Sequence, residues 1–204
     1  MSIVALISGR GSNLRALVEA GLPVTGVVSN VADAKGLDFA RSRGIATRVV
    51  EHRRFPTREA FDAALEQEIE TLAPRLVALA GFMRVLGAVF VRRYADRLLN
   101  IHPALLPSFP GLDTHARALA AGVKLHGCTV HFVTAEVDHG PIVIQAAVRV
   151  QPADTAESLA ARVLEQEHVI YPRAVRWFLD GRLLLQNGAV TVKGNDAQLV
   201  LPAD

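Results

Sequence analysis

Three polar side chains fall where strand-like runs end: Asn100 and His102 close an apolar run, and Asp138 stands just before Gly140 and Pro141. Residues two apart in an extended chain project to the same side, so Asn100 and His102 can converge on one small group. Asparagine offers an N–H donor that never titrates, whereas histidine gains or loses a proton near neutral pH. This pair suits a carbonyl carbon attacked by an amine, because charge grows on the oxygen while the nitrogen loses a proton.

The carboxylate of Asp138 is expected to hold the His102 imidazole protonated and to relay protons through water. Each of these residues also has a structural interpretation when taken alone, since aspartate favours turns and a histidine at a strand end is more often structural. His131 alternates with apolar neighbours, so it either points into the same cleft or is a core histidine, and the second interpretation is slightly favoured. Cys128 is expected to be a core thiol.

A glycine loop, Ser8 to Asn13, follows the first apolar run and leads into a helix pattern. Backbone N–H groups at a helix start bind anions, and glycines let the anion approach closely. A dinucleotide fingerprint would place a glycine at Leu14 and an acid at the end of the second strand, where this chain has Ser29 and Asn30. The loop therefore predicts a site for a phosphate monoester on a small substrate. The alternative is a tight turn that binds nothing.

Short β-branched runs alternate with helix-periodic stretches through the first half of the chain. The predicted strands are residues 3–7, 24–28, 47–50, 76–80 and 98–101, and the predicted helices lie near 12–20, 36–43, 57–72 and 84–93. Such alternation predicts an α/β class, with a Rossmann-like, mostly parallel sheet and helices on both faces. Ligands then bind beyond the carboxyl ends of the strands, where Asn100 and His102 stand.

The second half has a different pattern. Residues 127–133 and 142–150 read as two strands, and Asp154 with Glu157 forms a capping pair that opens a long helix. The dipeptide Asn187-Gly188 between two apolar runs predicts a C-terminal β-hairpin. The length of 204 residues favours a single domain, 1–204, made of a half at 1–100 and a half at 101–204.

Composition narrows the classes of partner. The net charge of +2 is small and its cations are scattered, which argues against nucleic acid or an anionic membrane. The single cysteine has no intramolecular disulfide partner, and no apolar run reaches the roughly 20 residues that cross a bilayer. We therefore expect a cytoplasmic protein. The chain carries no G-x-S-x-G, no H-E-x-x-H and no cysteine pair, so neither a serine hydrolase nor a metal site is expected.

Several stretches resemble the phosphoribosylglycinamide formyltransferases of purine synthesis, of the single-domain bacterial type, in the same order and at similar spacing. They are ISGRGSNL, LAGFMRVL, LLNIHPALLPSFPGL, HFVTAEVDHGPI and QEHVIYP. The resemblance implies that the amine of 5'-phosphoribosylglycinamide attacks the formyl carbon of 10-formyltetrahydrofolate directly, without a metal. The resemblance also implies that Asn100 and protonated His102 stabilise the oxyanion and that Asp138 assists proton transfer. The first half would then bind phosphate, and the second half would carry catalysis and a folate loop.

Further roles are implied by the resemblance alone. The substrate phosphate would meet Gly11, Ser12 and Asn13, and the amine would meet Glu167. The folate pocket would be lined by Arg58, Met83, Arg84, Val85, Leu86, Asn100, Thr134, Ala135, Glu136, Val137 and Asp138. The chain departs from the family pattern at His139, which could crowd or retune the folate loop, and at Asp113.

Rival functions share parts of this pattern. Formyltetrahydrofolate hydrolase and methionyl-tRNA formyltransferase share the catalytic trio, but each is expected to carry a further domain, and we expect this chain to have room for neither. A non-catalytic phosphometabolite-binding module would explain the glycine loop but not the convergence of Asn100, His102 and Asp138. The expected assembly is a monomer or a homodimer.

Overall fold

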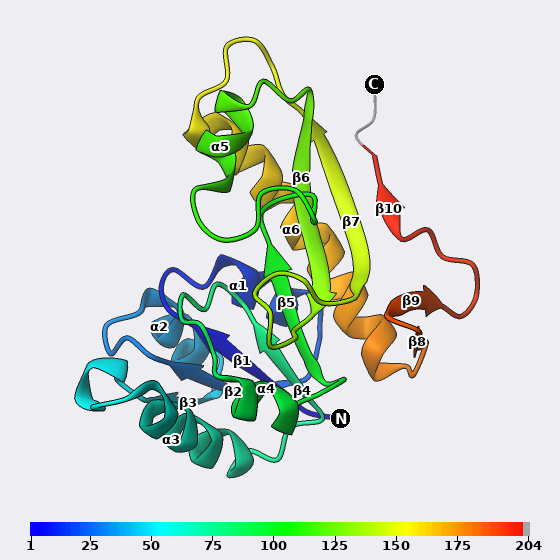
Figure 1. The fold of residues 1–204 in the computed structure, drawn as a ribbon. Coiled ribbons are helices and arrows are strands. Elements are labelled where there is room, and N and C mark those ends of the chain that lie inside the picture. The colour runs from blue at the N-terminus through cyan, green and yellow to red at the C-terminus, as the bar shows by residue number, and fades with distance from the viewer. Residues whose placement is uncertain (202–204) are drawn as a thin grey trace. The chain divides into compact units, whose positions relative to one another are not determined.

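A computed structural model describes residues 1–201, and the chain divides into two compact units, Met1–Asn100 and Ile101–Asp204 (Figure 1). The boundary falls inside one strand, directly after Asn100. The two halves predicted from the sequence meet at the same residue. That the two units make a single domain stays a prediction.

The first unit is an alternation of strands and helices. Its strands are β1 (Ile3–Ile7), β2 (Val24–Ser29), β3 (Ala46–Val49), β4 (Leu76–Leu79) and β5 (Leu98–His102), the last of which runs past the boundary. Its helices are α1 (Ser12–Glu19), α2 (Lys35–Ser42), α3 (Arg58–Glu70) and α4 (Ala88–Arg93), with a short 3-10 turn, η1 (His52–Arg54). The strand order is β5-β4-β1-β2-β3, and every pairing is parallel.

Burial explains why this part of the sheet is parallel. Every residue of β1 and β4 is buried, and successive side chains of a strand point to opposite faces, so both faces are covered. Helix α1 packs against α2, and α3 packs against α4. Figure 1 shows the two pairs on opposite sides of the strands. The predicted α/β class with a mostly parallel sheet and helices on both faces is confirmed.

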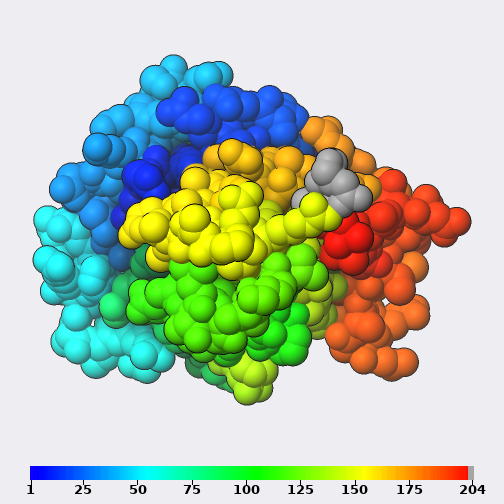
Figure 2. Space-filling model, turned by 90° about the horizontal axis from the view of Figure 1, so that it is seen from above, coloured from blue at the N-terminus to red at the C-terminus, as the bar shows by residue number. Residues whose placement is uncertain are grey.

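The second unit is built on an antiparallel pair. Its elements are α5 (Thr114–Ala120), β6 (Leu125–Phe132), β7 (Ile142–Arg149), α6 (Ala156–Leu179), β8 (Leu183–Gln186), β9 (Ala189–Val192) and β10 (Leu199–Val200). Strand β6 pairs antiparallel with β7, β10 pairs parallel with β7, and α6 packs on both long strands. The exposed turn that leads into α6 lies at the surface of this unit, in yellow in Figure 2.

The predicted C-terminal hairpin is confirmed. Strands β8 and β9 pair antiparallel, with Gln186 opposite Ala189. The two turn residues, Asn187 and Gly188, have φ angles of 50° and 76°, the left-handed conformation that a two-residue hairpin turn requires. This dipeptide is therefore at the turn where its residue types predict one.

Two local predictions are wrong. Helix α4 begins at Ala88, not near residue 84, because the segment before it is held as a loop. Helix α6 is capped one residue later than predicted: Thr155 and Ser158 exchange side-chain and backbone hydrogen bonds. Asp154 instead accepts the Gln151 N–H and pairs with Arg162. Helix α5 and the short strand β10 were not predicted.

Candidate active site

The second unit brings His102 and Asp138 together. Nδ1 of His102, at the end of β5, lies 3.3 Å from Oδ2 of Asp138, which sits in the loop between β6 and β7. On the other side of the carboxylate, Nε2 of His131 lies 3.7 Å from Oδ1. Both histidines are almost fully buried, at 5% and 1% exposure. The result is a carboxylate flanked by two imidazoles.

Hydrogen bonding ties the protonation of His102 to its surroundings. Its Nε2 lies 3.0 Å from the carbonyl oxygen of Phe109, and its Nδ1 faces Asp138. A carbonyl and an ionised carboxylate can only accept, so both contacts are hydrogen bonds at once only if the ring carries two protons. A neutral ring makes one of them. Proton uptake by His102 therefore completes the polar network around it.

Burial of the His102 ring nevertheless disfavours its protonated form. It lowers the pKa of His102 below the ordinary value of 6.5, and the carbonyl of Phe109 and the charge of Asp138 raise it only in part. The free protein thus favours neutral His102 at neutral pH. This differs from the expectation that Asp138 keeps His102 protonated, because the cost of burying the cation outweighs the attraction of the carboxylate.

Asp138 is held in its charged form. Burial pushes its pKa upward, but hydrogen bonding involving His131 and the Gly111 N–H, together with the charge of His102, brings the pKa below the ordinary value. The Gly111 N–H donates to Oδ2 at 2.8 Å. Asp138 has a φ angle of 58°, a left-handed conformation that aspartate tolerates better than most residues. The site therefore contains an ionised carboxylate beside a neutral imidazole.

Buried hydroxyl and amide groups fix the proline-rich stretch that follows β5. The Thr129 hydroxyl donates to the Ala104 carbonyl at 2.7 Å and accepts the Leu106 N–H at 3.1 Å. The Gln145 amide donates to Thr129 Oγ1 and to the Leu106 carbonyl, both at 2.9 Å. The Thr114 hydroxyl donates to the Pro103 carbonyl at 2.7 Å. Strands β6 and β7 thus set the backbone that continues from His102.

A second pair of histidines lies in the same unit. Nε2 of His126 is 3.2 Å from Nδ1 of His115, and the His126 ring also meets Phe109 edge-on. Burial, reinforced by the charge of His115, lowers the pKa of His126 to about 4. Burial also lowers the pKa of His115, with a further contribution from His102. Both rings are therefore neutral in the folded protein at neutral pH.

This pair predicts acid sensitivity of the fold. An unfolded histidine binds a proton near pH 6.5, whereas folded His126 binds one only near pH 4, so stability should fall as the pH falls between these values. For His126 alone the loss across this window is about 3 kcal/mol. Urea unfolding at pH 7.5 and pH 4.5 checks it: His126→Gln should lose less stability on acidification than the wild type. Equal losses would contradict the assignment.

Asn100 stands two residues before His102 in the same strand. It is the only partly exposed position of β5, whose other residues are all buried. Its backbone is held opposite Leu79 of β4. The strand geometry thus leaves the Asn100 side chain partly open to solvent at the carboxyl end of a parallel strand, as expected from its position in the sequence.

The glycine loop of the first unit ends in a helix start. Gly11 is the N-cap of α1 and has a φ angle of 73°, so a side chain here would strain the backbone. An added Cβ would also lie 2.7 Å from the Cα of Gly36. The first turn of α1, which contains Ser12 and Asn13, has no acidic residue. These features suit an anion at the helix N-terminus.

The predicted folate residues of this unit lie on an exposed loop and on α3. Met83 and Val85 are 68% and 48% exposed, whereas Leu86 is buried. Asp62 of α3 accepts the Gly87 N–H at 2.7 Å, and its pKa is raised by burial while the charges of Arg58 and Arg84 lower it. These two arginines therefore lie near the same carboxylate. Exposed apolar side chains on a held loop are available to a ligand.

The predicted folate loop of the second unit, Thr134 to Asp138, is held by hydrogen bonds between its own residues and His139. The Thr134 hydroxyl donates to the Glu136 carbonyl at 3.1 Å, and Nδ1 of His139 lies 2.7 Å from the Val137 carbonyl. His139 is exposed, and this contact places its ring against its own loop. An added Cβ on Gly140 would lie 1.7 Å from the Phe132 carbonyl oxygen, so only glycine fits there.

Glu167 lies on α6 and is buried. Its charge is close enough to contribute, after burial, to the raised pKa of the Cys128 thiol on β6. Cys128 is fully buried and free, as expected of a core thiol. The raised pKa keeps it protonated, which removes it as a candidate nucleophile.

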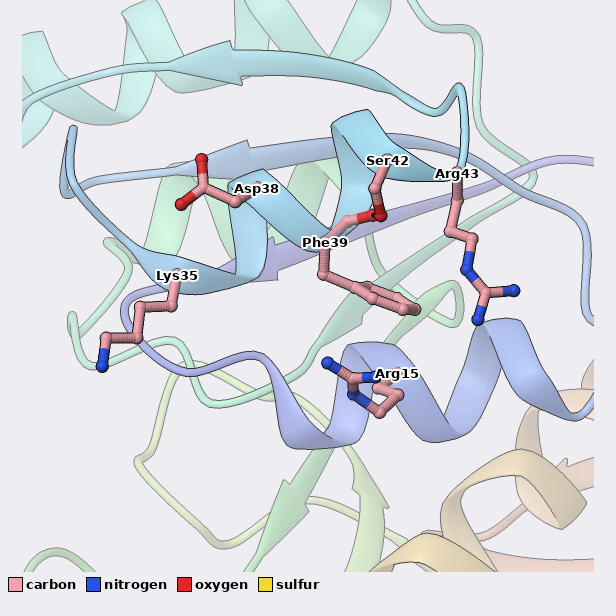
Figure 3. Close-up of a pocket in the computed structure, with 6 residues that line it drawn as sticks. All are labelled: Arg15, Lys35, Asp38, Phe39, Ser42 and Arg43. Carbon is pink, nitrogen blue, oxygen red and sulfur yellow. Dashed lines mark hydrogen bonds between the residues drawn. The ribbon is translucent and has the colours of Figure 1, made fainter.

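A separate depression of about 550 Å³ lies between α1 and α2 (Figure 3). The Phe39 ring points toward the guanidinium of Arg15, 4.4 Å from the ring centroid, and the guanidinium of Arg43 lies at 5.2 Å. The lining residues are Arg15, Lys35, Asp38, Phe39, Ser42 and Arg43. None of the residues predicted for the site lines this depression.

His131 has a larger part in the site than its sequence pattern indicates. The pattern slightly favours a core histidine, and the residue is both buried and in contact with the carboxylate of Asp138. Its alternation with apolar residues on β6 was the available signal. The carbonyl of Phe109 and the N–H of Gly111 were missed because backbone groups leave no mark in a sequence. Within residues 1–201, no cluster of three or more histidine, cysteine or acidic side chains is arranged to hold a metal ion.

The chain has a Rossmann-like α/β fold in which a buried histidine at the carboxyl end of the parallel strand β5 lies beside an ionised carboxylate, an arrangement suited to the proton transfers of a group-transfer enzyme. Residues 1–175 match the model of the formyl transferase family, and the chain belongs to that family. It is 50% identical to phosphoribosylglycinamide formyltransferase from Escherichia coli strain K12, over 95% of this chain and 94% of that protein. The resemblance seen in the sequence motifs is confirmed.

The chain is also similar in fold to solved structures of phosphoribosylglycinamide formyltransferases. The phosphoribosylglycinamide formyltransferase of Coxiella burnetii is 46% identical with a TM-score of 0.91, covering 95% of this chain and 94% of that one. The enzyme of that name from Anaplasma phagocytophilum is 42% identical with a TM-score of 0.94, covering 100% and 99%. Among the described residues, no helix has the length and apolar character needed to span a bilayer.

Proposed function

We propose that this protein transfers the formyl group of 10-formyltetrahydrofolate to the amine of 5'-phosphoribosylglycinamide in purine biosynthesis. The products are formylglycinamide ribonucleotide and tetrahydrofolate. The observation that carries the proposal is the 3.3 Å contact between His102 and ionised Asp138, in a chain that belongs to the formyl transferase family.

In this reaction the amine nitrogen bonds to the formyl carbon, and the bond from that carbon to folate N10 breaks. One proton leaves the amine and one reaches N10. Asn100 donates an uncharged N–H to the formyl oxygen as its negative charge grows, and His102 donates a charged one. Asp138 assists the transfer of the proton to N10. No covalent bond to the protein forms.

The neutral state of His102 in the free protein fits a site that is charged by its substrates. Both proposed substrates are anions, and nearby negative charge raises the pKa of a histidine. In protonated His102 the Nδ1–H faces Asp138, and the Nε2–H, which lies near the Phe109 carbonyl in the free protein, is the one proposed to donate to the formyl oxygen in place of that carbonyl. Binding and protonation therefore support each other.

Substrate binding is assigned from the family pattern and the local geometry. The Gly11 to Asn13 segment is proposed to hold the phosphate, because it begins a helix without acidic residues in its first turn. The exposed loop of Met83 to Leu86, with Arg58, and the loop of Thr134 to Asp138 are proposed to hold the folate. Glu167 is proposed to meet the substrate amine.

An absorbance assay for tetrahydrofolate release tests the function. Release should require 5'-phosphoribosylglycinamide, and it should stop when glycinamide without the phosphoribosyl group replaces it at the same concentration. A hydrolase would release tetrahydrofolate without any amine, and a binding module would release none. Either of these results would overturn the proposal.

A further inference from the structure

Ser8 lies between the two predicted substrate loops of the first unit. It directly precedes Gly9, the first glycine of the loop proposed to bind phosphate. Its N–H donates to the Gly81 carbonyl at 3.0 Å, and its hydroxyl accepts the Met83 N–H at 2.7 Å. One residue therefore joins the start of the phosphate loop to the backbone of the proposed folate loop.

A polar chain fixes the orientation of this hydroxyl. The Ser8 hydroxyl donates to Oδ1 of Asn30 at 2.6 Å, and the amide nitrogen of Asn30 lies 3.1 Å from Nδ1 of His52. Asn30 is buried at 4% exposure, and the His52 ring is packed edge-on against Phe61 of α3. Because its proton is committed to Asn30, the hydroxyl presents a lone pair to Met83.

Ser29 and Asn30 stand where a dinucleotide-binding protein would carry an acidic residue, and the proposed function does not otherwise use Asn30. A carboxylate there would bring a negative charge close to the glycine loop. An amide gives the acceptor that Ser8 needs without that charge. The end of β2 thus supports the connection between the loops.

We propose that Ser8 is a positioning residue that couples the two substrate loops, so that binding of either substrate strengthens binding of the other. The inference rests on the proposed function. The Ser8 hydroxyl is already oriented by Asn30 and already accepts the Met83 N–H. Ordering of the glycine loop around phosphate would restrict the remaining motion of the Ser8 backbone, and this bond would pass the restriction to the loop that receives folate. The folate loop has a second, independent anchor, because Asp62 accepts the Gly87 N–H at its other end.

Isothermal titration measures the coupling. The dissociation constant of a non-transferring deazafolate analogue is determined with and without saturating 5'-phosphoribosylglycinamide, and the reverse titration must give the same ratio. We expect a ratio of about 5 or more in the wild type. In Ser8→Ala the ratio should fall toward one, since one hydrogen bond contributes on the order of a fivefold effect.

Two matched variants separate coupling from general weakening. Ser2 makes the same kind of bonds, donating to the Ala73 carbonyl at 2.9 Å and accepting the Arg75 N–H at 3.3 Å, away from both loops. Ser2→Ala should leave both constants and the ratio unchanged. Asp62→Ala should weaken the folate analogue alone and keep the ratio, because it loosens the same loop without touching Ser8.

A measurement on the unmodified protein covers the case in which Ser8→Ala folds poorly. The substrate 5'-phosphoribosylglycinamide, added alone, should slow hydrogen exchange at the Met83 amide. The coupling is overturned if the ratio of dissociation constants is one in the wild type or if Ser8→Ala keeps the wild-type ratio. It is also overturned if 5'-phosphoribosylglycinamide leaves the hydrogen-exchange rate of the Met83 amide unchanged. If the wild type transfers formyl groups but shows no coupling, only this inference fails; if it binds neither molecule, the proposed function fails.

Discussion

Asp138→Asn should fold normally and transfer formyl groups about 10² to 10⁴-fold more slowly. The amide keeps the size of the carboxylate and can still accept the Gly111 N–H, so the loop should stay in place. It lacks the negative charge that raises the pKa of His102 against the effect of burial. It also cannot carry a proton toward the departing folate nitrogen.

Steady-state kinetics on the purified variant check this expectation. The loss should lie mainly in kcat, with a smaller loss of affinity for the folate, whose proposed loop ends at Asp138. The alkaline limb of the pH profile should move to lower pH, because His102 without the Asp138 charge gives up its proton more readily. Asp180→Asn, at the exposed end of α6 in the same unit, is the matched control and should keep full activity. Near-normal turnover of Asp138→Asn would remove this residue from the mechanism.

Asn100→Ala should lose about 10² to 10³ in kcat, the usual cost of one oxyanion donor. The side chain occupies the one partly open position of β5, so its removal leaves little cavity and the fold should persist. The effect should appear in kcat more than in KM, because the N–H is most valuable when charge has developed on the formyl oxygen.

Asn100→Asp separates the donor role from simple space filling. Aspartate has nearly the same shape as asparagine but offers no N–H when ionised. We expect it to be at least as impaired as the alanine variant, with circular dichroism and thermal unfolding close to the wild type. Retained activity in Asn100→Asp would contradict the assignment of Asn100 as an oxyanion donor.

The sheet was predictable because its signals are local. Strand β1 matches its predicted bounds, since a short fully apolar run before a glycine loop has few other solutions in an α/β chain. The hairpin at Asn187-Gly188 was equally predictable, because few dipeptides tolerate two left-handed residues in succession. Turn chemistry and apolar patterning are properties of neighbouring residues, so they indicate much of this framework directly.

The elements that the sequence did not predict correctly depend on contacts between distant parts of the chain. The apolar residues after Met83 fit a helix pattern, but Ser8 and Asp62 hold this segment as a loop through contacts from distant parts of the chain. Helix α5 is only seven residues long and follows a proline-rich stretch that gives little periodic signal. Short elements of this kind depend on their packing partners.

In the candidate site, too, some features could be predicted from local sequence and others depend on tertiary contacts. The positions of Asn100 and His102 followed from strand periodicity, but the contact of Asp138 with His131 depends on how the loop after β6 returns. The charge state of His102 could not be predicted from residue types, because burial decides it. Residue types indicated the chemistry, and the surroundings set the protonation.

The central claim is that the formyl group passes directly from folate to the substrate amine. The most direct measurement is the fate of an isotopically labelled formyl carbon, followed by mass spectrometry after reaction of labelled 10-formyltetrahydrofolate with 5'-phosphoribosylglycinamide. We predict that the label appears in the formylated nucleotide in equal amount to the tetrahydrofolate formed. Label recovered as formate, or a nucleotide that stays unlabelled, would contradict the account.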